Sequence, residues 1–268
     1  MPLRTRRRFL EYVGLGAGVL RAAQMPGRPV GADSGPRQPS RSNIMAIAAH
    51  PGDAFFAMGA PVALQTSLGG QGVFLSLSLG ERGSATIPPA RYGAMQRAAS
   101  GRAARMLAAQ TAFLTWPDGE IPVNEEVKFA VCDMIRQYKP AIVVTHWKGS
   151  WHKDHRACYE IVNDAVFYAG LPAIARKDPA HAVSRTFYAD NWEDADGFRV
   201  DTFLDITPVF DRWIEACAAF PMWLGENGFR YNDYYRSLAT ERGCLSGSRY
   251  AVALMSPAEQ LVHRTRSL

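Results

Sequence analysis

Residues 44–53 read IMAIAAHPGD and give the first indication of the fold. Its first six residues are apolar and long enough for one buried strand, after which the chain turns at His50, Pro51 and Gly52. Short apolar runs of the same kind recur downstream, separated by longer segments with helical periodicity. This alternation is typical of βαβ units around a parallel sheet.

The predicted elements follow one another without an internal repeat or a second domain. We expect strands at residues 44–49, 72–78, 111–116, 141–146 and 186–189, and helices at residues 91–109, 123–138, 154–168 and 208–220. The sequence therefore predicts an α/β fold, a Rossmann-like parallel sheet with helices on both faces, in a single domain that spans residues 44–268. In such a sheet, ligands bind beyond the carboxyl ends of the strands.

The basic charge of the chain lies in its first 43 residues. The net charge is +5, of which residues 1–24 contribute +4 and residues 25–43 contribute +2, so that the chain from Ile44 onward carries −1. We therefore expect no nucleic-acid partner, because no basic face remains on the folded domain.

The N-terminal segment has the pattern of an export signal. TRRRFL at residues 5–10 resembles a twin-arginine signal, and a weakly apolar run follows at residues 12–20. We expect residues 1–24 to be a twin-arginine-type signal peptide, residues 25–43 to be a flexible linker, and the protein to be exported, to the periplasm or elsewhere outside the cytoplasm. A basic tail without an export role is the alternative. The apolar run is too short and too rich in glycine for a permanent membrane span.

The cysteines stand singly rather than in CxxC pairs. Cys132, Cys158, Cys217 and Cys244 are therefore expected to be buried thiols instead of metal ligands. If the protein is exported, one disulfide remains an open alternative.

Two polar segments carry the residue types that bind metal. His50 and Asp53 stand three residues apart on the turn after the first strand, although Asp53 alone also fits the cap of the next helix. WHKDH at residues 151–155 follows the fourth strand and contains two more histidines. Two His and one Asp leave coordination positions open for water and substrate, as in a catalytic zinc site. The same donors form the triad of non-haem iron oxygenases, which we would expect on an antiparallel barrel.

These segments also carry a family resemblance. AHPGD at residues 49–53 and HKDH at residues 152–155 resemble the AHPDDE turn and the HxDH segment of the LmbE/PIG-L family of zinc-dependent N-acetyl deacetylases. The resemblance extends over residues 44–169 and includes GERG at 80–83 and PDGE at 117–120.

The resemblance implies a role for each matching residue. Zinc would be bound by His50, Asp53 and His155. His152 would lie over the substrate carbonyl, and Asp154 would hold a neighbouring imidazole in its working tautomer.

The chain departs from the family pattern at the catalytic base. Gly52 stands where the family has the Asp that takes a proton from the attacking water, and Ala54 stands where Glu is usual. A general base typically raises the reaction rate about 10²- to 10⁴-fold, whereas the metal separately lowers the pKa of its bound water to roughly 7. A site without the base would therefore be slow but still active. Glu81 is the candidate replacement base, with Asp154 or His152 behind it; an ordinary loop carboxylate is the alternative for Glu81.

The leading functional hypothesis is a zinc-dependent hydrolase that removes an acetyl group from a small N-acetylated sugar or glycoconjugate. NWED at residues 191–194 is a candidate lining of the pocket. Aromatic residues available to stack on a sugar, or alternatively to fill the core, are Trp147, Trp151, Trp192, Tyr231, Tyr234 and Tyr235. Gly52 also leaves open a non-catalytic metal- or carbohydrate-binding member of the same fold. Because relatives often self-associate, the resemblance also leaves a homo-oligomer open.

Overall fold

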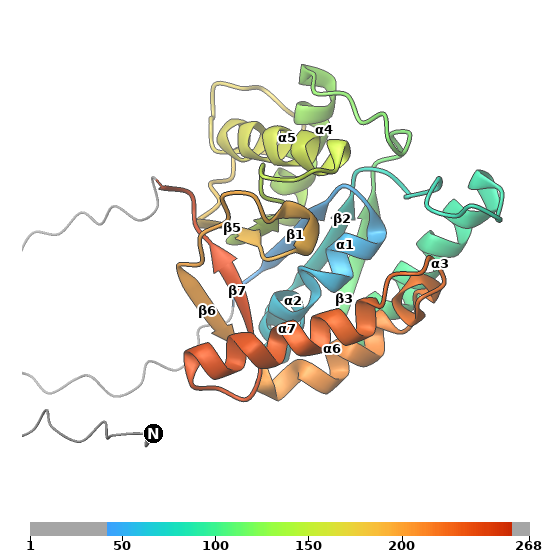
Figure 1. The fold of residues 1–268 in the computed structure, drawn as a ribbon. Helices are drawn as coiled ribbons and strands as arrows, with labels where there is room; N and C mark the ends of the chain where they lie inside the picture. Colours follow the sequence, from blue (N-terminus) through green and yellow to red (C-terminus); the bar gives the residue numbers. More distant parts are fainter. Residues whose placement is uncertain (1–41, 259–268) are drawn as a thin grey trace, which may run out of the picture. The chain divides into compact units, whose positions relative to one another are not determined.

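The structure, a computed structural model, describes residues 42–258. The predicted signal peptide and most of the predicted linker lie outside the described residues. Within them, seven strands form one sheet with the order β3-β2-β1-β4-β5-β7-β6 (Figure 1). The strands are β1 (Ile44–Ala48), β2 (Gly72–Ser76), β3 (Ala109–Phe113), β4 (Ile142–Thr145), β5 (Arg185–Ala189), β6 (Thr202–Asp205) and β7 (Ala251–Met255).

Helices connect most of the strands. They are α1 (Pro51–Phe56), α2 (Gly59–Ser67), α3 (Pro89–Met106), α4 (Glu125–Tyr138), α5 (Lys153–Ala169), α6 (Phe210–Cys217) and α7 (Tyr231–Ser246), with short 3₁₀ turns η1 (Trp192–Asp194), η2 (Thr207–Val209) and η3 (Pro221–Leu224). Within residues 42–258, none of these helices is both long enough and apolar enough to cross a membrane.

The predicted α/β fold is confirmed, with one difference at the edge of the sheet. Strands β1 to β5 pair in parallel, as the βαβ pattern predicts. β7 runs antiparallel to both β5 and β6, so the sheet is mixed rather than wholly parallel. The predicted elements do not include α1, α2, α7, β6 or β7. The two strands were missed because antiparallel strands at the edge of a sheet carry no βαβ pattern.

Helices cover both faces of the sheet, as expected. Side chains alternate along β1: Ala46 packs with the core formed by α1, α2, α3, α6 and α7, whereas Met45 and Ile47 pack with α4 and α5. The two layers lie on opposite sides of the strands in Figure 1. The middle of the sheet is therefore buried on both faces, and polar groups can gather only at its ends.

The order of the strands fixes where a ligand site can form. β1 lies between β2 and β4, so the crossover connections leave β1 and β4 toward opposite faces, α1 on one and α5 on the other. A crevice outside the carboxyl ends of the strands is expected at such a switch point. His50 lies two residues beyond β1, and His146 directly follows β4.

All four cysteines are free thiols, and three of them are buried. The exception is Cys244, which is exposed near the end of α7, so the prediction of a buried thiol is wrong at this position. The error follows from having missed α7, whose polar face points to solvent.

Arg136 on α4 joins α5 to the loop that follows it. Its side chain is buried, with 1% of its surface exposed, and no carboxylate pairs with it within the described chain. Its guanidinium instead donates hydrogen bonds of 2.9–3.2 Å to the backbone carbonyls of Tyr168, Ala169, Leu171, Ile174 and Asp178. Two of these carbonyls belong to the last turn of α5, where a cation is favoured by the helix dipole.

We predict that Arg136→Ala lowers the free energy of unfolding by at least about 3 kcal/mol, because five buried or part-buried backbone carbonyls lose a charged donor together. Chemical denaturation monitored by circular dichroism measures the loss. Arg176→Ala is the matched control, since Arg176 pairs with Asp133 while both side chains are about a third exposed and such pairs contribute little. Equal losses in the two variants would contradict the assignment.

Candidate metal centre

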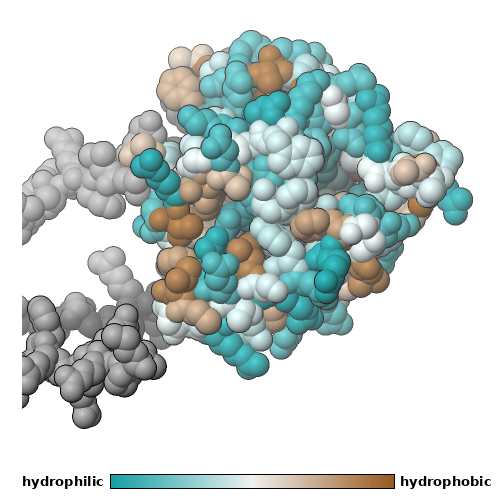
Figure 2. Space-filling view, in the orientation of Figure 1, coloured by the Kyte–Doolittle hydropathy of each residue, from teal (hydrophilic) through white to brown (hydrophobic). Residues whose placement is uncertain are grey.

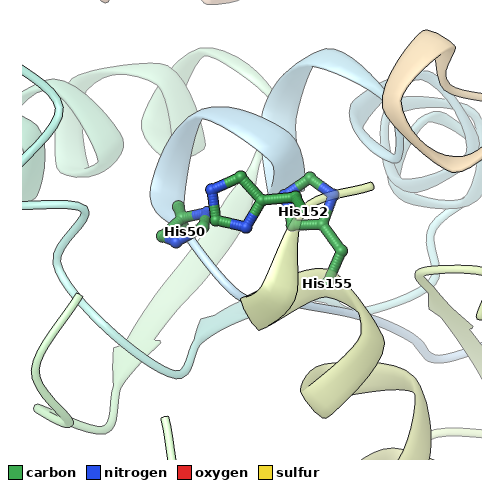
Figure 3. A group of neighbouring side chains, drawn as sticks. All are labelled: His50, His152 and His155. Carbon is green, nitrogen blue, oxygen red and sulfur yellow. The ribbon is translucent and has the colours of Figure 1, made fainter. Parts of the chain in front are cut away.

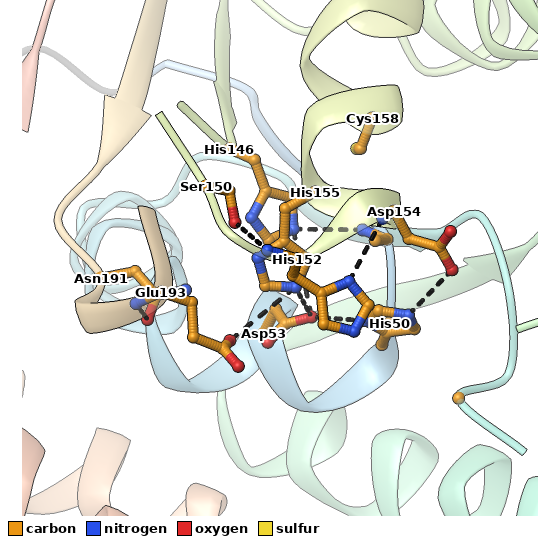
Figure 4. Close-up of polar contacts among 12 residues, drawn as sticks. His50, Asp53, His146, Ser150, His152, Asp154, His155, Cys158, Asn191 and Glu193 are labelled. Atoms are coloured by element: carbon orange, nitrogen blue, oxygen red, sulfur yellow. Dashed lines mark hydrogen bonds and ion pairs between the residues drawn. The ribbon is translucent and has the colours of Figure 1, made fainter. Parts of the chain in front are cut away.

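Side chains from β1, α1 and α5 converge at the carboxyl edge of the sheet (Figures 3 and 4). Asp53 Oδ2 lies 2.9 Å from His50 Nδ1 and 3.1 Å from His155 Nε2. His50, His152 and His155 each present one nitrogen within 4.8 Å of the other two. The structure thus brings together all three predicted ligands, His50, Asp53 and His155, although they come from two segments about 100 residues apart.

Each of the two predicted histidine ligands is held from behind by carboxylates. His50 Nε2 lies 3.0 Å from Asp118 Oδ1 and 3.4 Å from Asp154 Oδ2. His155 Nδ1 lies 2.8 Å from Asp194 Oδ1. One ring nitrogen of each imidazole is therefore engaged, and the other faces Asp53. This arrangement is typical of metal-binding histidines, whose second nitrogen is usually hydrogen-bonded to a carboxylate.

The donor set fits a divalent metal. Around tetrahedral zinc, ligand atoms at bond lengths near 2.0–2.1 Å are separated by about 3.3 Å, close to the 2.9 Å and 3.1 Å that separate Asp53 Oδ2 from the two nitrogens. Two imidazole nitrogens and one carboxylate oxygen suit zinc and also iron. We conclude that His50, Asp53 and His155 are able to hold such an ion.

The electrostatics of the site favour a cation. Burial alone would lower the pKa of His50, but the carboxylates of Asp118, Asp154 and Asp53 raise it well above the usual value. In the same way the negative charges of Asp53 and Asp194 overcome burial and raise the pKa of His155 to about 10. The pKa of Asp53 is held well below its ordinary value, against the effect of burial, by the two imidazoles. The site therefore concentrates negative charge that a metal ion would balance.

His146 lies beside the ligands but is already satisfied. Its Nε2 accepts a hydrogen bond from the Ala49 backbone at 3.2 Å, and its Nδ1 lies 2.8 Å from Asp194 Oδ2. Although His146, Asp53 and His155 also form a compact group, no lone pair of His146 remains for a metal. Asp194 holds His146 with one oxygen and His155 with the other, so a single buried carboxylate positions both rings.

His152 caps α5, and this contact fixes its tautomer. Its Nδ1 accepts a hydrogen bond from the Asp154 backbone N–H at 3.2 Å. Burial, followed by the charges of His155 and His50, lowers the pKa of His152 to about 4, so the ring is neutral at pH 7. A neutral ring with its Nδ1 lone pair engaged carries its proton on Nε2. His152 is therefore a hydrogen-bond donor, and the structure does not favour it as a replacement base.

Glu81 does not contact the histidines within the described residues. Its Oε1 accepts a hydrogen bond from the Asp118 backbone N–H at 2.9 Å, and the Arg82 N–H donates to Asp118 Oδ2 at 2.9 Å. Glu81 thus orients the Asp118 loop. Asp154 contacts His50, the contact needed to hold a neighbouring imidazole.

Two functional carboxylates were not assigned by sequence reasoning. Asp118 and Asp194 lie in PDGE and NWED, segments that follow predicted strands, and that position was the only signal available for them. Glu193, the neighbour of Asp194, lies with its Oε2 3.8 Å from His155 Nε2. Burial, followed by the negative charge of Asp53, raises the pKa of Glu193 to about 7.

Comparison with known proteins agrees with this geometry. Residues 45–166 match the family model for GlcNAc-PI de-N-acetylase, PIG-L. The chain contains a PIG-L family domain. The family resemblance predicted from the two histidine segments is thereby confirmed.

Individual relatives of the PIG-L domain include both a deacetylase and a hydratase. Diacetylchitobiose deacetylase of Thermococcus kodakarensis is 26% identical over 223 residues, which cover 78% of this chain and 80% of the relative. The 4-oxalmesaconate hydratase of Pseudomonas putida is 25% identical over 219 residues, 76% of this chain and 80% of the relative. The crystal structure of GalB, a 4-carboxy-2-hydroxymuconate hydratase of the same organism, has a TM-score of 0.75 at 22% identity and covers 84% of this chain and 99% of its own.

We predict that Asp194→Asn weakens metal binding about 10- to 100-fold, because one of the two imidazoles loses its carboxylate partner. Competition with a chromogenic chelator measures the affinity for zinc. Asp196→Asn is the control, since Asp196 is exposed two residues away. An unchanged affinity in Asp194→Asn, with Tm also unchanged, would show that Asp194 does not position a ligand.

Proposed function

We propose that this PIG-L domain protein is a zinc-dependent hydrolase that removes an acetyl group from a small N-acetylated sugar or glycoconjugate. The observation that carries the proposal is the convergence of His50, Asp53 and His155 beside a neutral His152. When bound, the metal would polarise the amide carbonyl and lower the pKa of a water molecule.

The side chains of this chain supply the remaining functions. The Nε2–H of His152 is available to donate a hydrogen bond to the carbonyl oxygen as negative charge develops there, which is the task of an oxyanion hole. Asp118 and Asp194 keep the two imidazole ligands in place. These groups need no rearrangement during the reaction because they are already hydrogen-bonded, and such preorganisation is the main source of electrostatic stabilisation.

The rim of the site supports a sugar as the substrate. Trp151 is 62% exposed, and its ring centroid lies 5.6 Å from that of His152 and 5.7 Å from that of Trp192. Trp192 in turn stacks on Phe229 at 4.6 Å. An exposed indole next to the reacting groups offers a face for a sugar ring. The diacetylchitobiose deacetylase relative is consistent with this substrate class.

We predict that the purified protein contains about one zinc per chain and releases acetate from N,N′-diacetylchitobiose or a related N-acetylated sugar. His155→Ala removes a ligand and should abolish both metal content and acetate release, measured by elemental analysis and an enzyme-coupled acetate assay. His181→Ala is the control, since within residues 42–258 the imidazole of His181 hydrogen-bonds only the Pro140 carbonyl. Acetate release by metal-free His155→Ala would overturn the proposal, and iron as the activating metal would overturn the assignment of zinc.

We predict that Trp151→Ala raises KM for the sugar several-fold with little change in kcat, because stacking binds the substrate without touching the reacting bond. Phe167→Ala is a matched control: Phe167 is also 62% exposed but lies 12 residues beyond His155 on α5, about 18 Å along the helix. Steady-state kinetics distinguish the two variants. Equal KM values in both would exclude stacking on Trp151.

A second candidate activity is hydration of a carbon–carbon double bond. The similarity to 4-oxalmesaconate hydratase is as great as the similarity to the deacetylase, so sequence identity does not separate them. Incubation with 4-oxalmesaconate, followed by the loss of its ultraviolet absorbance, tests this candidate. Binding of N-acetylated sugars without any turnover would instead favour a non-catalytic member of the fold.

A further inference from the structure

The space next to Gly52, where a larger side chain would lie, is occupied by apolar atoms of other residues. In the family this position carries the base. A Cβ atom added to Gly52 would lie 3.1 Å from Met222 Sδ and 3.3 Å from Phe56 Cε2. The Met222 sulfur also accepts a hydrogen bond from the Gln96 amide at 3.6 Å. The thioether of Met222 therefore occupies the space into which a side chain at position 52 would grow.

The other carboxylates around the metal centre are committed to structural contacts. Asp118 bonds His50 with one oxygen and the Arg82 N–H with the other. Both oxygens of Asp194 hold imidazoles.

Asp154 and Glu81 are also engaged. Asp154 Oδ2 accepts from the Gly119 N–H at 2.6 Å and contacts His50. Its Oδ1 has no hydrogen-bond partner within residues 42–258, but the whole side chain is buried away from water. Glu81 Oε1 is bonded to the Asp118 backbone. Asp118 and Asp194 therefore have both oxygens engaged, Asp154 is closed off from water, and Glu81 contacts no histidine within residues 42–258.

Glu193 is the exception. Its carboxylate accepts no hydrogen bond from residues 42–258, and its Oε2 lies 3.8 Å from His155 Nε2, beyond hydrogen-bond distance. The side chain is 11% exposed, so water has access to it. Figure 4 shows the carboxylate of Glu193 directed toward Asp53 and His155.

The backbone holds Glu193 in this position. Its carbonyl accepts a hydrogen bond from the Trp151 N–H at 3.2 Å, and its own N–H donates to Asn191 Oδ1 at 3.3 Å. The residue thus belongs to a fixed 3₁₀ turn directly beside Asp194, which positions His155.

We propose that Glu193 is the general base that replaces the missing residue at position 52; this inference rests on the proposed deacetylase function. The Glu193 carboxylate takes a proton from a water molecule as the water oxygen bonds to the amide carbonyl carbon. The C–N bond then breaks, and the proton passes from Glu193 to the departing nitrogen. The products are acetate and the free amine of the sugar, with no oxidant or further reactant needed.

The test compares four variants on N,N′-diacetylchitobiose and related N-acetylated sugars. Glu193→Gln keeps the shape of the side chain and removes its basic oxygen. The double variant Gly52→Asp/Met222→Ala supplies a carboxylate from α1 and the room it needs. The triple variant combines all three changes, and Glu160→Gln is the control because Glu160 is exposed on the outer face of α5. Bound zinc and Tm are measured for every protein alongside kcat and KM.

We expect Glu193→Gln to lower kcat about 10²- to 10⁴-fold while zinc content and Tm match those of Glu160→Gln. In the triple variant the same substitution should cost less than about 10-fold, because Asp at position 52 then acts as the base.

Three results would overturn the inference. In the first, Glu193→Gln retains the kcat of Glu160→Gln, which leaves the proposed function standing. In the second, Glu193→Gln loses its zinc, which makes Glu193 a support for His155 instead. In the third, neither the wild type nor the Gly52→Asp/Met222→Ala variant releases acetate while both bind zinc, in which case the proposed function fails as well.

Discussion

The parallel pairing of β1 with β4 sets the distance between the two halves of the metal centre. The register joins Ile44 to Ile142 and Ala46 to Val144, so the two strands end within one residue of each other. His50 lies two residues beyond β1, and His155 lies in the first turn of the helix that follows β4. A slip of one residue would shift one strand by about 3.3 Å and reverse the faces of its side chains. The contact of Asp53 with both imidazoles would then be impossible.

The charges around this centre depend on one another. Asp194 holds His146 and His155 through its two oxygens, and Asp118 and Asp154 share His50. Removal of Asp194 would leave an imidazole without an orienting partner in a region that excludes most water, where an unsatisfied polar group is costly. His50 would keep one of its two partners if either Asp118 or Asp154 were removed. The outer carboxylates therefore maintain the geometry of the ligands. The engaged oxygens of Asp118 and Asp194 and the complete burial of Asp154 make these groups poor candidates for proton transfer.

Much of the fold follows from local sequence, but the carboxylates that hold the imidazole ligands in place could not be identified in this way. The alternation of apolar runs and helical segments predicts β1 to β5, and the two histidine segments predict which residues meet. The roles of Asp118 and Asp194 depend on contacts with His50 and His155, residues 68 and 39 positions away. No periodicity records such contacts. Glu81 was selected as a base because it follows a strand, yet its carboxylate turns to the Asp118 backbone, a choice that only packing decides.

Gly52 also affects the charge of the neighbouring ligand, Asp53. An acidic residue at position 52 would place a negative charge next to Asp53, and like charges at such separations raise the free energy of both ionised groups. With Gly52 and the apolar contacts of Met222 on that side, the charge of Asp53 is balanced by His50 and His155. A carboxylate on η1 instead lies beside His155, with Glu193 Oε2 3.8 Å from His155 Nε2, although the charge of Asp53 still acts on it. With Glu193 as the base, proton transfer depends on η1, whereas the proposed metal ligands lie in the turn after β1, in α1 and in α5. The two tasks are then carried by different segments of the sequence, although their side chains lie close together.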